Sequence, residues 1–229
     1  MEDARIFVAV PYYGTIWPRF TNNLIALIVH LCNVGIDKHF YDSCDGISLH
    51  RAQNGLVCRF LRSPCTHIFF LEQDMIIEPE LPLRLAEHDL DIVGAGYTHK
   101  HVAPQPHLYQ YKRKDEFGYI YDKIEEFEDG LVEVDATGSG ALLVKREVFE
   151  SLIPNWLEID EKSFEGPEWF SYRERGTTDF FFCRKAKEAG YKIYVDTTLH
   201  AIHLRLGEAT WDQWLRMKEK EKENGNLTK

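Results

Sequence analysis

Two acidic residues, Glu72 and Asp74, directly follow an apolar run and are separated by a single glutamine. The run, His67 to Leu71, lies between Ser63-Pro64 and Glu78-Pro79, so it predicts a buried strand that ends at the acids. Side chains two apart in an extended segment point the same way, and paired carboxylates repel each other unless a cation neutralises them. The pair therefore predicts a divalent metal site that would hold phosphates. Capping of the next turn is the structural alternative.

Two histidines, His200 and His203, end a strand that is predicted late in the chain. They are three residues apart, so in an extended segment their side chains face opposite ways and only one of them can join a given site. Carboxylates combined with an imidazole suit manganese-like ions, which accept oxygen and nitrogen ligands together. A structural role is the alternative for either histidine.

Alternating strands and helices are predicted for the first two-thirds of the chain, with helix caps at Thr21 or Asn22 and at Ser48. Successive units of this kind favour a largely parallel, doubly wound sheet, which binds ligands at the carboxyl ends of its strands. The predicted strands are 6–10, 39–41, 67–71 and 91–94, and the predicted helices are 20–31, 48–63 and a short one near Pro79.

The pattern changes after Gly96, where a long loop leads to a predicted hairpin within 108–121. We expect one domain over residues 1–209, followed by a charged helical tail over 210–229. Strands are predicted at 131–136, 141–145, 193–195 and 199–202, and helices at 146–152, 178–189 and from Thr210 onward.

Composition limits the class of protein. The 229 residues are 44% hydrophobic, which suffices for one large domain with a full core. The net charge of −10 argues against a general nucleic-acid binder. Neither an apolar stretch of about 18 residues nor a signal peptide is found. The five cysteines include no C-x-x-C pair, so we expect a reduced, cytoplasmic protein.

The order of these features resembles the GT-A-fold glycosyltransferases, particularly compact single-domain members related to family 2. The resemblance spans about residues 6 to 204 and implies an α/β nucleotide-diphospho-sugar transferase fold. Such a fold has a mostly parallel, Rossmann-like sheet flanked by helices, with a small antiparallel sheet on the acceptor side. The matching segments are Val10-Pro11-Tyr12-Tyr13-Gly14, Arg51-Ala52-Gln53-Asn54, Glu72-Gln73-Asp74, 136–140, 177–186, and 189–193 followed by His203.

The resemblance implies a donor site built around the acids. Asp74 and His203 match metal ligands of the family, whereas Glu72 replaces the usual first aspartate and is a methylene longer. Glu72 would touch the ribose, a metal-bound water or the ion itself. The residues expected to contact the nucleotide are Pro11, Tyr12, Tyr13, Arg51, Asn54, Glu72 and Gln73. For Arg51 and Asn54, which share a helix face, a solvated surface is the alternative.

Asp179 is the expected general base, because the family places an aspartate at this helix start to take the acceptor's proton. The family usually has a glutamate before it, where this chain has Thr178. Helix capping is the alternative for Asp179. Gly138 and Gly140 would let an acceptor approach the backbone, or form a tight turn. Trp169, with Phe170 and Tyr172, would stack on a sugar, or be buried.

The resulting prediction is a metal-dependent glycosyltransferase that uses Mn2+ or Mg2+ and a nucleotide-sugar donor. A UDP-sugar is expected, with a GDP-sugar as alternative. The acceptor is a hydroxyl compound whose class stays open: glycan, metabolite, protein or modified nucleobase. A basic patch formed by 99–101 and 112–114 would suit an anionic acceptor, or be solvated. The rival functions are a catalytically silent nucleotide- or sugar-binding module and a sugar nucleotidyltransferase. The latter normally has a Gly-rich loop after its first strand, which 11–18 lack.

Overall fold

Eleven strands and six α-helices form the described part of this computed structural model, which covers residues 4–12, 16–35, 40–45, 48–100, 104–158, 167–173, 176–205 and 207–226. The strands are β1 Ile6–Tyr12, β2 Phe40–Asp45, β3 His67–Leu71, β4 Met75–Ile77, β5 Ile92–Gly96, β6 Tyr109–Asp115, β7 Gly118–Lys123, β8 Leu131–Val134, β9 Ala141–Lys145, β10 Ile193–Arg205 and β11 Gly207–Ala209. The α-helices are α1 Pro18–Asn33, α2 Leu49–Arg62, α3 Leu81–Ala86, α4 Arg146–Leu152, α5 Thr178–Glu188 and α6 Trp211–Asn226.

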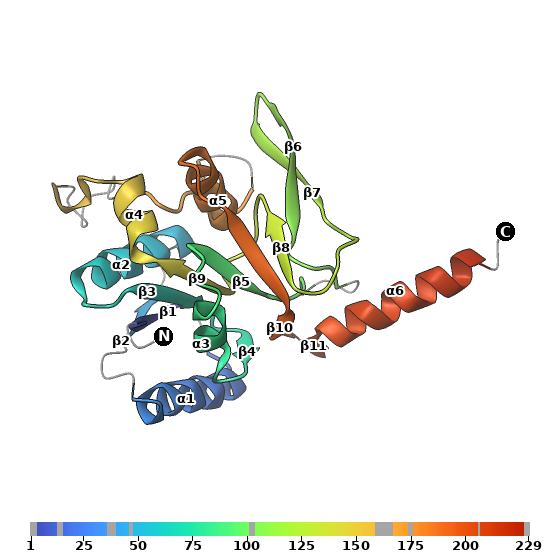
Figure 1. Cartoon of the computed structure of the whole chain (residues 1–229), viewed down its shortest axis with the longest axis horizontal. Coiled ribbons are helices and arrows are strands. Elements are labelled where there is room, and N and C mark those ends of the chain that lie inside the picture. The colour runs from blue at the N-terminus through green and yellow to red at the C-terminus, as the bar shows by residue number, and fades with distance from the viewer. Residues whose placement is uncertain are drawn as a thin grey trace.

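A central sheet orders its strands β11-β10-β5-β9-β3-β1-β2 (Figure 1). β1 is parallel to β2 and β3, and β5 is parallel to β10, whereas β9 is antiparallel to both β3 and β5. Five strands therefore run in one direction, and the predicted mostly parallel α/β sheet is confirmed. Parallel strands end at the same edge of a sheet, so the segments that follow β3, β5 and β10 meet there.

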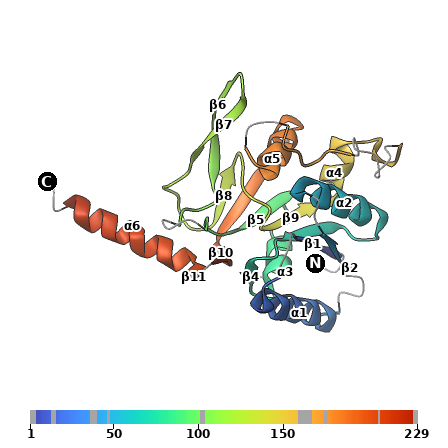
Figure 2. The same ribbon diagram turned by 180° about the vertical axis from the view of Figure 1, so that it is seen from behind.

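Helices cover both faces of this sheet. Figures 1 and 2 show α2, α4 and α5 on one face and α1 and α3 on the other. Strand β3 supplies both cores, because Ile68 and Phe70 pack in the cluster under α2 and α4 while Phe69 and Leu71 pack in the cluster under α1. A strand buried on both faces needs apolar residues at successive positions, which explains the unbroken apolar run before the acids.

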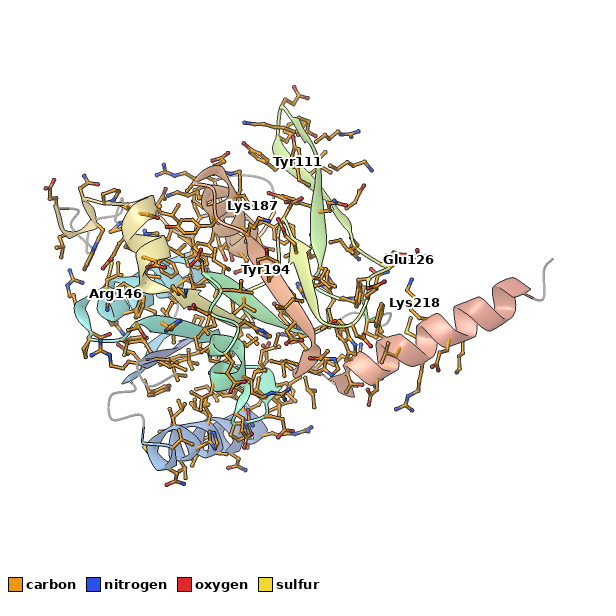
Figure 3. All side chains as sticks on the ribbon, viewed as in Figure 1. Tyr111, Glu126, Arg146, Lys187, Tyr194 and Lys218 are labelled. Atoms are coloured by element: carbon orange, nitrogen blue, oxygen red, sulfur yellow. The ribbon has the colours of Figure 1, made fainter. Side chains whose placement is uncertain are left out.

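Arg146, labelled in Figure 3, joins the end of α2 to the start of α4. Its guanidinium donates to the backbone oxygens of Phe60, Leu61, Ser63 and Cys65 at distances of 2.6 to 3.0 Å. The last carbonyls of a helix have no partner within the helix, so a cation at this end satisfies them and favours the helix dipole. This contact fixes α2, which carries part of the candidate site described below.

Several predicted boundaries differ from the structure. The first helix begins at Pro18 with Trp17 as its N-cap, not at Thr21 or Asn22, because proline fits the first helical position. The two strands predicted at 193–195 and 199–202 are one strand, β10, with an irregularity between Asp196 and His200. The short strands β4 and β11, which pair with β10, were not predicted.

A two-stranded antiparallel sheet, β6–β7, projects from the body beside α5 (Figure 2). The predicted hairpin is thereby confirmed. Helix α6 extends away from the body, but its first turn is anchored: Trp214 stacks on Phe127 with ring centroids 5.4 Å apart, and Trp211 packs on His200. Among the described residues, none of the helices combines the length and apolarity needed to cross a membrane.

His67, at the start of β3, should make stability depend on pH. Its burial, aided by the charge of Lys145, lowers its pKa to about 4, whereas an unfolded histidine titrates near pH 6.5. Between these values the unfolded chain binds more protons, so the free energy of unfolding falls as pH falls from 6.5 to 4. This group contributes at most about 3 kcal/mol to that fall. Thermal denaturation of His67→Gln should show a smaller loss over this window; an unchanged loss would contradict the assignment.

Candidate metal and catalytic site

A tight turn, and not a continued strand, presents the two acids. Strand β3 ends one residue before Glu72, and the amide of Met75 donates to the Glu72 carbonyl at 2.9 Å. Strand β4 then runs antiparallel to β10, with Met75 opposite His203. The extended geometry expected for 72–74 is therefore wrong, but the pairing of β4 with β10 sets Asp74 beside His203.

Glu72, Asp74 and His203 form the candidate metal site. One ligand atom from each lies within 4.8 Å of the others, and His203 Nε2 lies 3.6 Å from Asp74 Oδ1. Ligands about 2.1 Å from a small divalent cation are at most about 4.2 Å apart, so a modest closure of the cluster would suit such an ion. Mixed carboxylate and imidazole donors suit manganese-like ions.

The orientation of His203 supports metal binding. Its Nδ1 lies 2.9 Å from the carbonyl oxygen of Thr98. A carbonyl only accepts, so Nδ1 carries a proton, and Nε2 is the ring nitrogen that faces Asp74 and that can serve as a metal ligand. Both Nε2 of His203 and Oδ1 of Asp74 are buried without a hydrogen-bond partner. Buried polar atoms normally have partners, so this facing pair fits a cation.

His200 points elsewhere, as expected for a residue three positions away on the same strand. Its Nε2 lies 2.7 Å from the carbonyl oxygen of Thr197, and its ring stacks on Trp211. The structure therefore brings only one of the two histidines to the acids.

Lys100 forms an ion pair with Asp74 through Oδ2, the oxygen that does not face His203. Burial alone would raise the pKa of Asp74, but the neighbouring His203 and Lys100 outweigh it and lower the pKa. Asp74 is therefore ionised at neutral pH, as a metal ligand must be.

A buried hydrogen-bonded network joins Glu72 to Asp179. The amide nitrogen of Gln53 donates to Asp179 Oδ1 and to Ser139 Oγ, both at 3.0 Å. The Ser139 hydroxyl in turn donates to Glu72 Oε1 at 3.2 Å. Asp179 lies in the first turn of α5, where Thr177 is the N-cap, so its carboxylate faces this interior network. Asp179, the predicted base, and Glu72, the predicted donor-site acid, are thus linked through the hydrogen bonds of Gln53 and Ser139.

Both acids of this network have raised pKa values. Burial is the main cause for Glu72, whose pKa rises to about 8 with further contributions from the charges of Asp179 and Asp74. Burial likewise raises the pKa of Asp179, against the hydrogen bonds from Ser139 and Gln53. Strongly perturbed carboxyls that cluster in one place are typical of functional sites.

Asn54 and Arg51, the two residues of α2 that are expected to contact the nucleotide, have different surroundings. Asn54 anchors the backbone: its Oδ1 accepts from the amides of Trp169 and Phe170, at 3.1 and 2.9 Å, and its Nδ2 donates to the Phe170 carbonyl. Its side chain is therefore engaged within the protein, and its contact with a nucleotide stays a prediction. Arg51, one turn earlier on α2, is partly exposed.

The end of β1 carries two further expected nucleotide contacts. Pro11 is buried and Tyr12 is partly buried at this end, while Tyr13 lies outside the described residues. Gln73 is partly buried in the turn between the acids. Contact of Pro11, Tyr12 and Gln73 with a nucleotide stays a prediction.

Tyr97, and not an acceptor, fills the space beside the two glycines. Its hydroxyl accepts a hydrogen bond from the amide of Gly140 at 3.2 Å. A Cβ added to Gly140 would lie 3.0 Å from Tyr97 Cζ, and one added to Gly138 would overlap Tyr97 Oη. The glycines therefore permit close approach, as expected, but the group that approaches is a tyrosine of the same chain.

Gly138→Ala should lower the free energy of unfolding by about 1–3 kcal/mol, because the added methyl collides with the Tyr97 hydroxyl oxygen. Tyr97→Phe removes the colliding oxygen, so the double variant should lose less than the sum of the two single losses. Urea denaturation of the four proteins measures this coupling. Strict additivity would show that the two residues do not compete for the same space.

The aromatic residues near α5 differ in exposure. Trp169 and Phe170 are fully buried, and Trp169 Nε1 donates to the carbonyl of Phe149 at 2.9 Å. Burial in the core therefore describes Trp169 better than sugar stacking. Tyr172 is 52% exposed and packs edge-on against His50.

Two lysines of the basic patch expected from 99–101 and 112–114 are engaged in ion pairs. Lys100 pairs with Asp74, whereas Lys112 lies on β6 and pairs with Asp122 at 2.8 Å. His101 lies outside the described residues.

Three residues were not predicted in the roles that the structure gives them: Gln53, Ser139 and Lys100. One signal was present for Gln53, which lies on the apolar stripe of α2 with Leu56 and Phe60 and is itself completely buried. A polar residue in a buried stripe needs a partner and often belongs to a site. Ser139 and Lys100 carry no such local signal.

Comparison with solved structures assigns the chain a GT-A-like fold. Its fold is similar to that of A197 from STIV, with a TM-score of 0.57 and 21% identity over 88% of this chain and 86% of that chain. It is also similar to GalNAc-T7, whose crystal structure contains UDP, GalNAc and Mn2+, with a TM-score of 0.54 and 9% identity over 88% of this chain and 43% of that chain. Likeness at such identities establishes the fold alone. No protein-family profile and no curated protein matches the sequence.

Proposed function

We propose that the protein is a metal-dependent glycosyltransferase that moves a sugar from a nucleotide-diphosphate donor to a hydroxyl acceptor. The main observation behind this proposal is that His203 Nε2 and Asp74 Oδ1, both buried without a hydrogen-bond partner, face each other at 3.6 Å. The GT-A-like fold supports the proposal, because a glycosyltransferase with this fold has been crystallised with UDP and Mn2+.

On the donor side, Asp74 and His203 would hold Mn2+ or Mg2+, with Glu72 as the third ligand or as a contact to the ribose. The cation, when bound, supplies positive charge to the diphosphate leaving group. Asp74 is the stronger ligand of the two acids because its pKa is lowered, whereas the raised pKa of Glu72 makes it hold a proton. A UDP-sugar is the expected donor, and a GDP-sugar is the alternative.

On the acceptor side, Asp179 would take the proton of the attacking hydroxyl. The hydroxyl oxygen bonds to the anomeric carbon while the bond from that carbon to the phosphate oxygen breaks, and the proton passes to the carboxylate. Gln53 holds Oδ1 of Asp179 at 3.0 Å and so fixes the orientation of the carboxylate. Burial raises the pKa of Asp179, which makes it a stronger base than an exposed aspartate.

The proposal is tested by measuring thermal stability with a panel of UDP- and GDP-sugars, each with and without MnCl2. A ligand present at about 100 times its Kd stabilises by about 2.7 kcal/mol, so Tm should rise by roughly 5–10 °C with the correct donor and metal together. Slow Mn2+-dependent hydrolysis of that donor would separate an enzyme from a silent binding module. No stabilisation by any nucleotide sugar in the presence of MnCl2 would overturn the proposal.

A further inference from the structure

The ammonium group of Lys100 supplies positive charge to Asp74 on the carboxylate oxygen that does not face His203. It pairs with Asp74 Oδ2, while Oδ1 and His203 Nε2 face each other unpartnered. The Asp74 side chain is 13% exposed, whereas that of Lys100 is 44% exposed. Lys100 therefore reaches in from the solvent side to neutralise an acid that is mostly buried.

The backbone of Lys100 is tied to the same elements that build the site. Arg205, near the end of β10, donates to the Lys100 carbonyl at 3.1 Å. Two residues earlier, the Thr98 carbonyl orients the His203 ring. The segment after β5 thus orients the ring of His203 and brings the Lys100 ammonium to Asp74. The exposed four-carbon stem of the lysine leaves its ammonium free to turn.

We propose that Lys100 alternates between two anions: it pairs with Asp74 when no divalent cation is bound, and it pairs with the donor diphosphate when one is. The inference rests on the proposed function and adds a diphosphate-binding residue to it. A divalent cation held by Asp74 and His203 would repel the ammonium at this distance. The nearest new anion would be the diphosphate on that cation, and lysine is a common phosphate ligand.

Charge balance favours this second position of Lys100. Departure of the sugar leaves the diphosphate with one more negative charge than it has in the donor. A lysine ammonium that has left Asp74 adds one positive charge near that group, where developing charge is stabilised best by preorganised cations.

The test is Lys100→Met, measured by isothermal titration calorimetry with two probes. With MnCl2 alone the variant should bind more tightly, by about fivefold, because the competing ion pair is gone. With UDP in saturating MnCl2 the variant should bind more weakly, by about tenfold or more, because a charge-assisted contact is lost. GDP is titrated in parallel to cover the alternative base. Opposite signs in the two titrations cannot come from partial unfolding, which weakens both.

Lys112→Met is the matched control, because Lys112 lies on exposed β6 in a pair with Asp122. Neither titration should change in this variant. Unchanged values in Lys100→Met would overturn the Lys100 inference and leave the proposed function standing. Weaker MnCl2 binding in Lys100→Met would likewise overturn it. If the parent protein binds neither MnCl2 nor either nucleotide, both proposals fail.

Discussion

Asp74→Asn is expected to abolish Mn2+ binding and to lower donor turnover by about a hundredfold or more. Asparagine has nearly the same shape as aspartate but lacks the charge that holds a divalent cation. It also leaves the Lys100 ammonium without its carboxylate, so this cation would stay beside the site and oppose metal entry. Calorimetry with MnCl2, followed by turnover of the donor found in the thermal screen, measures both effects.

The matched control for Asp74→Asn is Asp122→Asn, which breaks an exposed ion pair on β7 without touching the site. Exposed pairs contribute about 0–1 kcal/mol, so stability and metal binding should hardly change in the control. Full metal affinity in Asp74→Asn would contradict the site assignment. Metal binding lost with turnover intact would instead point to a metal-independent reaction.

The sheet could be predicted because its strands are buried on both faces. The unbroken apolar run at His67–Leu71 has no polar side that could face solvent, so a strand buried on both faces was expected there. Helix α4, Arg146–Leu152, was also predicted with its observed bounds. Strand β10 was split in the prediction because Thr197 and Thr198 interrupt its apolar residues. In the structure, Asp196 accepts from the amide and the hydroxyl of Thr198, at 2.8 and 2.6 Å, and this local bonding lets the strand continue through an irregularity.

The acids and histidine of the site were predictable because each follows a recognisable strand. The network behind them was not, because its bonds join residues far apart in the chain: Gln53 meets Asp179 at a separation of 126 residues and Ser139 at 86. Local periodicity carries no information on such pairs. The same limit applies to Trp169, since its exposure depends on which residues pack over it and not on its neighbours in sequence.

The network also links the two halves of the proposed reaction. Gln53 and Ser139 place hydrogen-bond donors on the donor-side acid Glu72 and on the acceptor-side acid Asp179. Two buried carboxyls that share donors affect each other's protonation, so a cation bound beside one of them changes the protonation of the other. Binding at the donor site would therefore favour the ionised form of Asp179, which is the form that accepts a proton.

Asp179→Asn is expected to lower turnover by about a hundredfold or more while Mn2+ and nucleotide binding stay within about twofold of the parent. Asparagine cannot accept the proton of the acceptor hydroxyl, and general bases contribute about 10²–10⁴ in rate. Its amide still fills the space beside Gln53, so the buried network loses a charge but little volume. Single-turnover measurements with the identified donor, combined with calorimetry, separate the chemical step from binding.

The pH dependence of turnover provides an independent check on Asp179. The base must be ionised to act, so turnover should fall as pH is lowered, with a midpoint above the ordinary aspartate value because burial raises the pKa of Asp179. Glu188→Gln, on the exposed end of the same helix, should keep both the rate and this midpoint.

If Asp179→Asn kept near-normal turnover, another group would have to take the proton. The candidates would be the groups that face the same network: Glu72, Tyr97 and Tyr172. All three have pKa values raised by burial, but Glu72, with a pKa of about 8, releases its proton at a lower pH than the two tyrosines, whose ordinary pKa is already near 10, so Glu72 is the group to test next.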